Sequence, residues 1–136
     1  MRRSLLPACL AVLALAVPAG AAKTATVHNT QSSSYLMIDP IYTTIMDGNR
    51  IAGLMMVGIG LDVPDGDLRA QAKRSMPVLR DVYVRSLMAY TATSVRPWRQ
   101  PDVGEIADRL QRVTDRTLKR KGARILLAQV AMRLKK

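Results

Sequence analysis

The segment Ile-Ala-Gly-Leu-Met-Met-Val-Gly-Ile-Gly-Leu-Asp-Val, residues 51–63, decides the fold of this chain. Apolar side chains recur at every second position, and only Gly53 interrupts the face that they form. That face carries Ile51, Met55, Val57, Ile59, Leu61 and Val63. One apolar face with a period of two is typical of a β-strand that lies against helices. We therefore predict a strand here, with this face toward the core.

A turn and a second strand precede this segment. Asp47-Gly48-Asn49-Arg50 supplies residues that accept positive φ, as tight hairpin turns require. Residues 35–46 are rich in β-branched and aromatic side chains, but Pro40 lacks a backbone donor. We therefore expect an edge strand or two short pieces there. The two strands and the turn are therefore predicted to form a β-hairpin from Tyr35 to Val63.

Apolar residues at helical spacing follow the hairpin in the sequence. Asp65 or Asp67 is placed to cap the first turn of a helix. Pro77 cannot join a helix interior without breaking its hydrogen-bond ladder. The spacing therefore predicts a short helix, a break near Ser75 and Met76, and a second helix that begins at Pro77.

A further helix and a final strand complete the expected fold. Asp102 followed by Glu105 resembles a capping box, and Gly122 is expected to stop that helix. Residues 123–134 are predicted to form a strand. Its core face is expected to carry Leu126, Ala128, Val130 and Met132. The order β-β-α-α-β predicts a single α+β domain whose helices cover one face of the sheet.

The first 22 residues are typical of a targeting segment. Arg2 and Arg3 precede an apolar run from Leu5 to Val17, and small residues follow it. This order indicates a secretory signal peptide. The stretch from Ser4 to Ala22 is also long enough for an N-terminal membrane anchor. Both alternatives place the domain in the periplasm, either soluble after cleavage or held at the inner membrane by residues 4–22.

Residues 23–34 are polar and without a period, so we expect a flexible linker before a folded domain over residues 35–136. The only cysteine, Cys9, lies in the targeting segment, which excludes a disulfide or a cysteine metal site in the domain. The net charge is +11, and removal of Arg2 and Arg3 lowers it to +9. Export argues against a nucleic acid as the partner. It favours anionic lipid, cell-wall polymer or an acidic protein surface.

Residue patterns that would carry chemistry are missing. His28, the only histidine, lies in the linker without orienting partners. Asp47 and the helix-capping aspartates have structural roles. Gly58 and Gly60 lie inside a strand, whereas a phosphate loop joins a strand to a helix. We therefore predict no catalytic, cofactor-binding or metal-binding residue, and a protein that is not an enzyme.

Three motifs carry a resemblance to a known family. They are Leu61-Asp62-Val63, the acidic turn Asp65-Gly66-Asp67, and Met76-Pro77-Val78-Leu79-Arg80-Asp81. With the apolar stretch 82–91, the helix 102–118 and the strand 125–132, this pattern resembles the periplasmic domain of the flagellar basal-body-associated protein FliL. The resemblance covers residues 35–133.

The resemblance implies a stomatin-like fold and a ring-like homo-oligomer around the flagellar stator, near the inner membrane surface. It implies support of stator function, torque and motility without catalysis or cofactors. Basic residues outside the apolar stripes, together with one tryptophan, are the candidate contacts with stator or basal-body proteins. They are the helix group Arg69, Lys73, Arg74, Arg80 and Arg85, and the loop group Arg96, Trp98 and Arg99. The alternative is a periplasmic module that binds anionic lipid or cell-wall polymer and has no role in motility.

Overall fold

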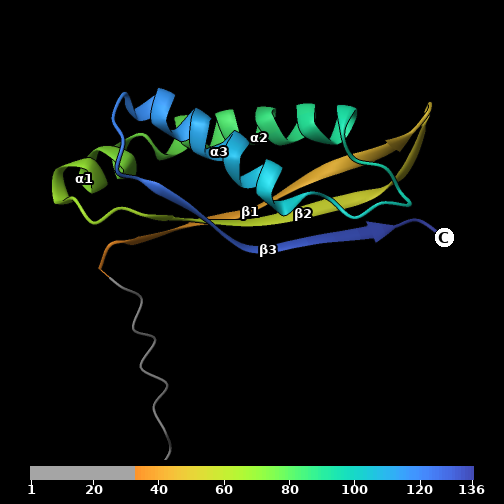
Figure 1. The fold of residues 1–136 in the computed structure, drawn as a ribbon, viewed down its shortest axis with the longest axis horizontal. Coiled ribbons are helices and arrows are strands. Elements are labelled where there is room, and N and C mark those ends of the chain that lie inside the picture. Colours follow the sequence, from red (N-terminus) through yellow and green to blue (C-terminus); the bar gives the residue numbers. More distant parts are fainter. Residues whose placement is uncertain (1–32) are drawn as a thin grey trace, which may run out of the picture.

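Three antiparallel strands and three helices form two layers in the computed structural model, which describes residues 33–136 (Figure 1). The elements are β1 (Tyr35–Asp47), β2 (Arg50–Asp62), α1 (Gly66–Arg74), α2 (Met76–Thr93), α3 (Val103–Leu118) and β3 (Arg124–Leu134). The predicted α+β class, with helices on one face of the sheet, is confirmed. The order is β-β-α-α-α-β, because the break at Ser75 separates α1 from α2. The predicted targeting segment, Cys9, His28 and most of the predicted linker lie outside the described residues.

Strand β2 lies in the middle of the sheet and pairs with β1 on one side and β3 on the other. Its predicted core face is confirmed for Met55, Val57, Ile59 and Leu61, which are buried. The same prediction is wrong for Ile51, whose side chain is 60% exposed. Ile45 pairs with Gly53 and Met46 with Ile51, so Ala52 is an extra residue in β2. This bulge shifts the alternation by one residue, and Ile51 faces away from the core together with its partner Met46.

Strand β1 is a single edge strand with a bulge at Pro40. Ile38 pairs with Ile59, and Ile41 pairs with Val57, so β1 has one more residue than β2 between these two pairs. Because side chains alternate along a strand, residues 38 and 41 would point to opposite faces without the bulge. With it, both isoleucines are buried in the core.

Strand β3 also has a bulge, which corrects the prediction of its core face. Ile59 pairs with Leu127 and Gly58 with Gln129, so Ala128 is the extra residue. Before the bulge, Ile125 and Leu127 face the core, not Leu126 and Ala128 as expected. After the bulge, the predicted Val130 and Met132 do face the core. The expected face was wrong in its first half because a bulge shifts the phase of alternation by one residue.

The helix break lies where Pro77 predicts it. The Ser75 backbone N–H donates to Gln71 O at 2.9 Å and ends α1, while Ser75 O accepts from the Leu79 N–H at 2.9 Å and begins α2. Pro77 lies in the first turn of α2, where no intrahelical donor is needed. Of the two predicted caps, Asp65 is the one used, because its Oδ1 accepts from the Leu68 N–H at 2.6 Å.

Helix α3 begins as predicted but ends early. The Asp102 carboxylate accepts from the Glu105 N–H at 3.0 Å. The expected stop at Gly122 is wrong, because the helix ends at Leu118 and Lys119 takes the left-handed conformation, with a φ of 53°. The Gln71 side-chain amide donates to Leu118 O at 3.0 Å, so a group from α1 satisfies the last carbonyl.

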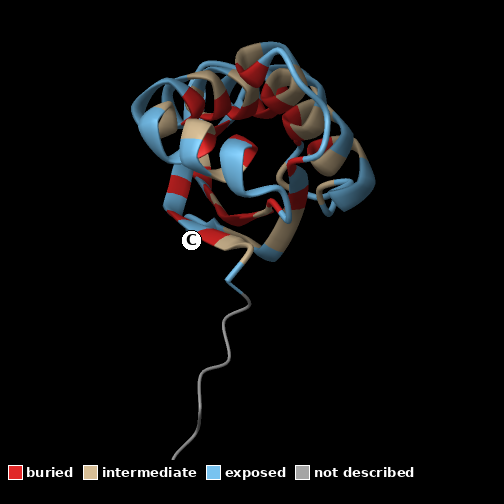
Figure 2. Cartoon of the chain, turned by 90° about the vertical axis from the view of Figure 1, so that its left-hand side faces the viewer, coloured by how far each residue is buried: buried red, intermediate tan, exposed pale blue. Residues whose placement is uncertain are grey.

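The core lies between the two layers. Helix α2 packs on β1 and α3 packs on β3. Figure 2, which looks along the length of the sheet, shows buried residues lining the interior and exposed residues outside. The far face of the sheet has no helix over it, and Met37, Tyr42 and Leu54 are exposed there.

Replacing Gly53 with alanine is expected to lower the free energy of unfolding by about 2 to 3 kcal/mol. A Cβ at this position would overlap the carbonyl oxygen of Arg133, and strand backbone cannot yield as a side-chain end can. Gly58→Ala is the matched control on the same strand, because its Cβ would meet nothing closer than 3.5 Å. It should change stability by no more than about 1 kcal/mol. Urea unfolding of both variants measures the difference, and equal effects would contradict this account of Gly53.

Candidate functional site

The predicted helix group of basic residues is only partly free for an external partner. Arg69 Nη1 donates to Val63 O at 2.8 Å and to Pro64 O at 3.1 Å, so this side chain holds the turn between β2 and α1. Arg80 Nη1 donates to Asp39 O at 3.1 Å and connects α2 to the bulge of β1. Arg85 forms an ion pair with Asp81 one turn earlier in α2. These three charges have partners inside the domain.

Lys73 and Arg74 are the free members of this group. Both are exposed in the last turn of α1, and neither forms an ion pair within residues 33–136. Cations are favourable at this end of a helix because they face its unpaired carbonyls. Both charges remain available to an acidic surface.

The loop group forms a tight turn beyond the other end of α2. The Arg99 N–H donates to Arg96 O at 3.1 Å, and Pro97 and Trp98 form the tip between them. Trp98 is 75% exposed. The 18-residue helix α2, about 27 Å long, lies between this turn and the free members of the first group, Lys73 and Arg74. The structure therefore does not bring the two predicted groups together.

A groove of about 710 Å³ lies next to this turn. The tip of the β1–β2 hairpin, Pro97 and the end of β3 form it. Its lining residues are Asp47, Asn49, Arg50, Ile51, Ala52, Pro97, Leu134, Lys135 and Lys136. A second hollow of about 320 Å³ shares Ile51, Leu134 and Lys135 with it and adds Arg133. This end of the molecule therefore carries both apolar and cationic side chains.

The sequence prediction missed this groove. It placed Ile51 in the core and named only Trp98 and its flanking arginines. The pairing of Gly53 with Leu134 brings the two ends of the groove together, and that pairing is a tertiary contact. Two signals were present in the sequence: an isoleucine directly after a hairpin turn, and Lys135-Lys136 directly after a strand.

A small apolar cleft of about 270 Å³ lies beside the same end, between β1 and α2. Tyr42, Met46 and Met88 line it and are exposed. Thr43 also lines it, and its hydroxyl is buried without a hydrogen-bond partner among the described residues.

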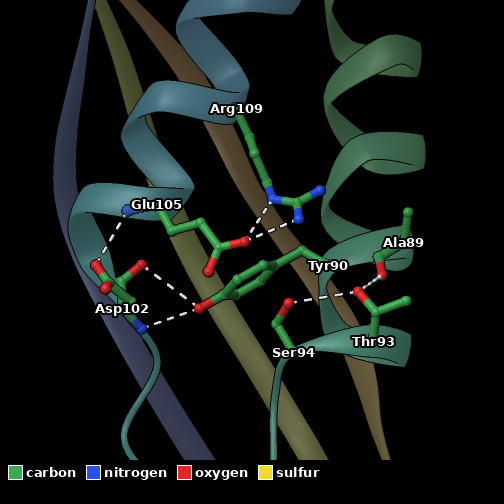
Figure 3. Close-up of polar contacts among 7 residues, drawn as sticks. All are labelled: Ala89, Tyr90, Thr93, Ser94, Asp102, Glu105 and Arg109. Carbon is green, nitrogen blue, oxygen red and sulfur yellow. Dashed lines mark hydrogen bonds and ion pairs between the residues drawn. The ribbon is translucent and has the colours of Figure 1, made fainter.

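A polar cleft of about 470 Å³ lies where α2 ends and α3 begins (Figure 3). The Asp102 N–H donates to Tyr90 Oη at 2.9 Å, and the Tyr90 hydroxyl donates to Asp102 O at 3.4 Å. Arg109 lies over the Tyr90 ring, 5.5 Å from its centroid, and pairs with Glu105 at 2.8 Å. Burial raises the pKa of Tyr90, so its hydroxyl stays protonated. These polar groups therefore form hydrogen bonds, an ion pair and a cation–π contact with one another, and these contacts connect α2 to α3.

A second tyrosine connects α2 and α3 inside the core. Tyr83 is fully buried, and its hydroxyl lies 2.6 Å from Thr114 Oγ1. The Thr114 hydroxyl donates to Leu110 O at 2.7 Å, so Tyr83 donates to Thr114. Burial raises the pKa of Tyr83 to about 12, because the apolar core disfavours a phenolate.

Within residues 33–136, no three or more His, Cys, Asp or Glu side chains are grouped so that they could hold a metal ion. Of the helices in that same range, none has both the length and the apolar character to span a membrane. Comparison with protein-family models gives no match for the chain, and comparison with curated protein sequences gives none either.

Stability should fall at alkaline pH because of Tyr83. In the unfolded chain this tyrosine loses its proton near the usual pKa of 10.0, whereas the folded protein keeps it to about pH 12. Between these values the unfolded state binds fewer protons, so rising pH lowers the free energy of unfolding, by about 2 to 3 kcal/mol. Urea unfolding across this window, compared with Tyr83→Phe, isolates the contribution. If the free energy of unfolding of the Tyr83→Phe protein fell with pH as steeply as that of the wild type, this role of Tyr83 would be contradicted.

Proposed function

We propose that this chain is a non-enzymatic accessory protein of the flagellar basal body, similar to FliL, that supports the stator and hence motility. The resemblance in the sequence requires two strands, a helical region and a final strand that returns to the sheet. The observation that supports the proposal is that the motif residues occupy the junctions of such a fold. Leu61 and Val63 are buried at the end of β2, and residues 76–81 begin the central helix.

The motif side chains connect the elements of the domain. Asp65 caps α1, Leu79 on the inner face of α2 is fully buried, and Arg80 reaches the backbone of β1. These contacts stabilise the domain as a scaffold. A scaffold with free basic side chains on its outside fits a protein that works by contact with other proteins.

Lys73 and Arg74 are the side chains of the helix group that we propose for contact with stator or basal-body proteins. They are exposed and carry no ion pair within the described residues, so an acidic partner surface would bind them without first breaking an internal contact. Assembly of the chain into a ring-like homo-oligomer near the inner membrane surface belongs to the same proposal.

The test of this role is swimming in soft agar by a strain in which the gene is cleanly deleted, with flagella counted by microscopy. Normal filaments with reduced or lost swimming would support a function at the motor, and the wild-type gene supplied in trans should restore swimming. Unchanged swimming would reject the motor role. It would favour the alternative, a periplasmic module that binds anionic lipid or cell-wall polymer.

The contact residues have a separate test in the same strain. Lys73→Glu with Arg74→Glu should fail to restore swimming, because reversed charges repel an acidic partner. Arg112→Glu with Arg116→Glu, on the exposed face of α3, makes the same change in net charge and should restore it. Arg80 and Arg85 are less suitable, since reversal there also breaks contacts with Asp39 and Asp81. Full restoration by the Lys73/Arg74 variant, at normal protein level, would rule this surface out.

A further inference from the structure

We propose that the end of the domain formed by the hairpin tip, the Pro97-Trp98 turn and the end of β3 docks on a bilayer that contains anionic phospholipid. We call it the tip surface and define it by Arg50, Ile51, Trp98, Leu134, Lys135 and Lys136. This inference does not depend on a role at the flagellar motor.

The first argument is the gathering of exposed apolar side chains at this end. Ile51 is 60% exposed, Trp98 75% and Leu134 45%. Ile51 and Leu134 line the same groove, and Pro97, which precedes Trp98 in the turn, lines it with them. Tryptophan favours the boundary between water and acyl chains, because its large apolar ring carries one polar N–H. These side chains would leave water if they entered the headgroup region of a bilayer.

The second argument is charge. Arg50, Lys135 and Lys136 line the groove, and Arg133 lines the hollow beside it. None of these four forms an ion pair within the described part of the chain. Among the described residues that line the groove, Asp47 is the only carboxylate side chain. A groove of about 710 Å³ with several free cations accommodates a phosphate-bearing headgroup.

The shape of this end favours a bilayer over a protein partner. The hairpin tip, the turn at Trp98 and the end of β3 project at the same end of the molecule (Figure 1). A stable protein interface needs a complementary, well-packed patch, whereas a fluid bilayer accepts side chains that project from separate turns. The surface lies at the end of the sheet opposite Tyr35, where β1 begins.

The chain carries its own reporter of this docking. Trp98 is the only tryptophan, so the tryptophan fluorescence of the full chain arises from the tip surface. Vesicles of equal parts phosphatidylglycerol and phosphatidylcholine should shift its emission to shorter wavelength, and bromine atoms on the acyl chains should quench it. Vesicles of phosphatidylcholine alone should do neither, which also controls for insertion of the apolar N-terminal segment. Raised salt should weaken the response.

Two variants separate the contributions of charge and apolar contact. Arg50→Gln with Lys135→Gln and Lys136→Gln should weaken the vesicle affinity on the order of 100-fold, from the usual contribution of each cation near an anionic surface. The matched control, Arg112→Gln with Arg116→Gln and Lys121→Gln, removes the same charge from exposed positions on α3 and the turn after it. It should change affinity by less than about threefold. Ile51→Ser with Leu134→Ser should weaken binding on the order of tenfold.

Several outcomes would overturn the proposal. Emission that does not respond to anionic vesicles would exclude contact of Trp98 with the bilayer. Equal weakening by the two charge variants would show that net charge, not the tip surface, binds the lipid. A wavelength shift without quenching by brominated lipid, reproduced by a soluble polyanion, would identify a polymer partner instead. Every substituted position is exposed, and circular dichroism checks that each variant remains folded.

Discussion

The burial of β2 between two neighbouring strands is the constraint on which the rest of this structure depends. Both of its edges are hydrogen-bonded and one of its faces is sealed by helices, so a slip by one residue would turn every core side chain to the wrong face. The edge strands adapt to it. The bulge at Pro40 in β1 and the bulge at Ala128 in β3 both lie opposite the neighbourhood of Gly58. Each bulge lets its strand keep apolar side chains toward the core both before and after the extra residue.

Polar side chains that bind main-chain groups join the helical layer to the sheet. Arg80 binds the backbone of β1. Within the helical layer, Gln71 of α1 binds the last carbonyl of α3. The Gln111 amide donates to Ala123 O at 2.8 Å, and its oxygen accepts from the Ile125 N–H at 2.9 Å, so one side chain connects α3 to the start of β3. The described residues contain no cysteine, so these contacts and the apolar core hold the domain without a disulfide.

The fold separates two kinds of basic surface. Around α1 the free charges, Lys73 and Arg74, are exposed in the last turn of the helix, which suits a polar contact with an acidic protein. At the other end, Ile51 and Leu134 share a groove with Arg50, Lys135 and Lys136, and the exposed Trp98 follows Pro97 at its edge. Because the strands run the length of the molecule between these ends, both surfaces can be occupied at the same time. The two proposals therefore describe compatible contacts of one scaffold.

The sequence by itself determined the class of fold, the hairpin, the break before Pro77 and the cap Asp102, because each follows from local periodicity or from the chemistry of one residue. It offered Asp65 and Asp67 as caps of α1, and the structure selected Asp65. The contacts that it predicts for Trp98 and the basic residues remain predictions. Only the tertiary structure decided the core face of β3, the exposure of Ile51, the end of α3 at Leu118 and the groove at the tip. A bulge depends on the register of a partner strand, and a helix end can depend on a side chain 47 residues away, as Leu118 depends on Gln71. Such long-range pairings leave no periodic signal in the chain, so they became visible only when the strands and helices were placed together.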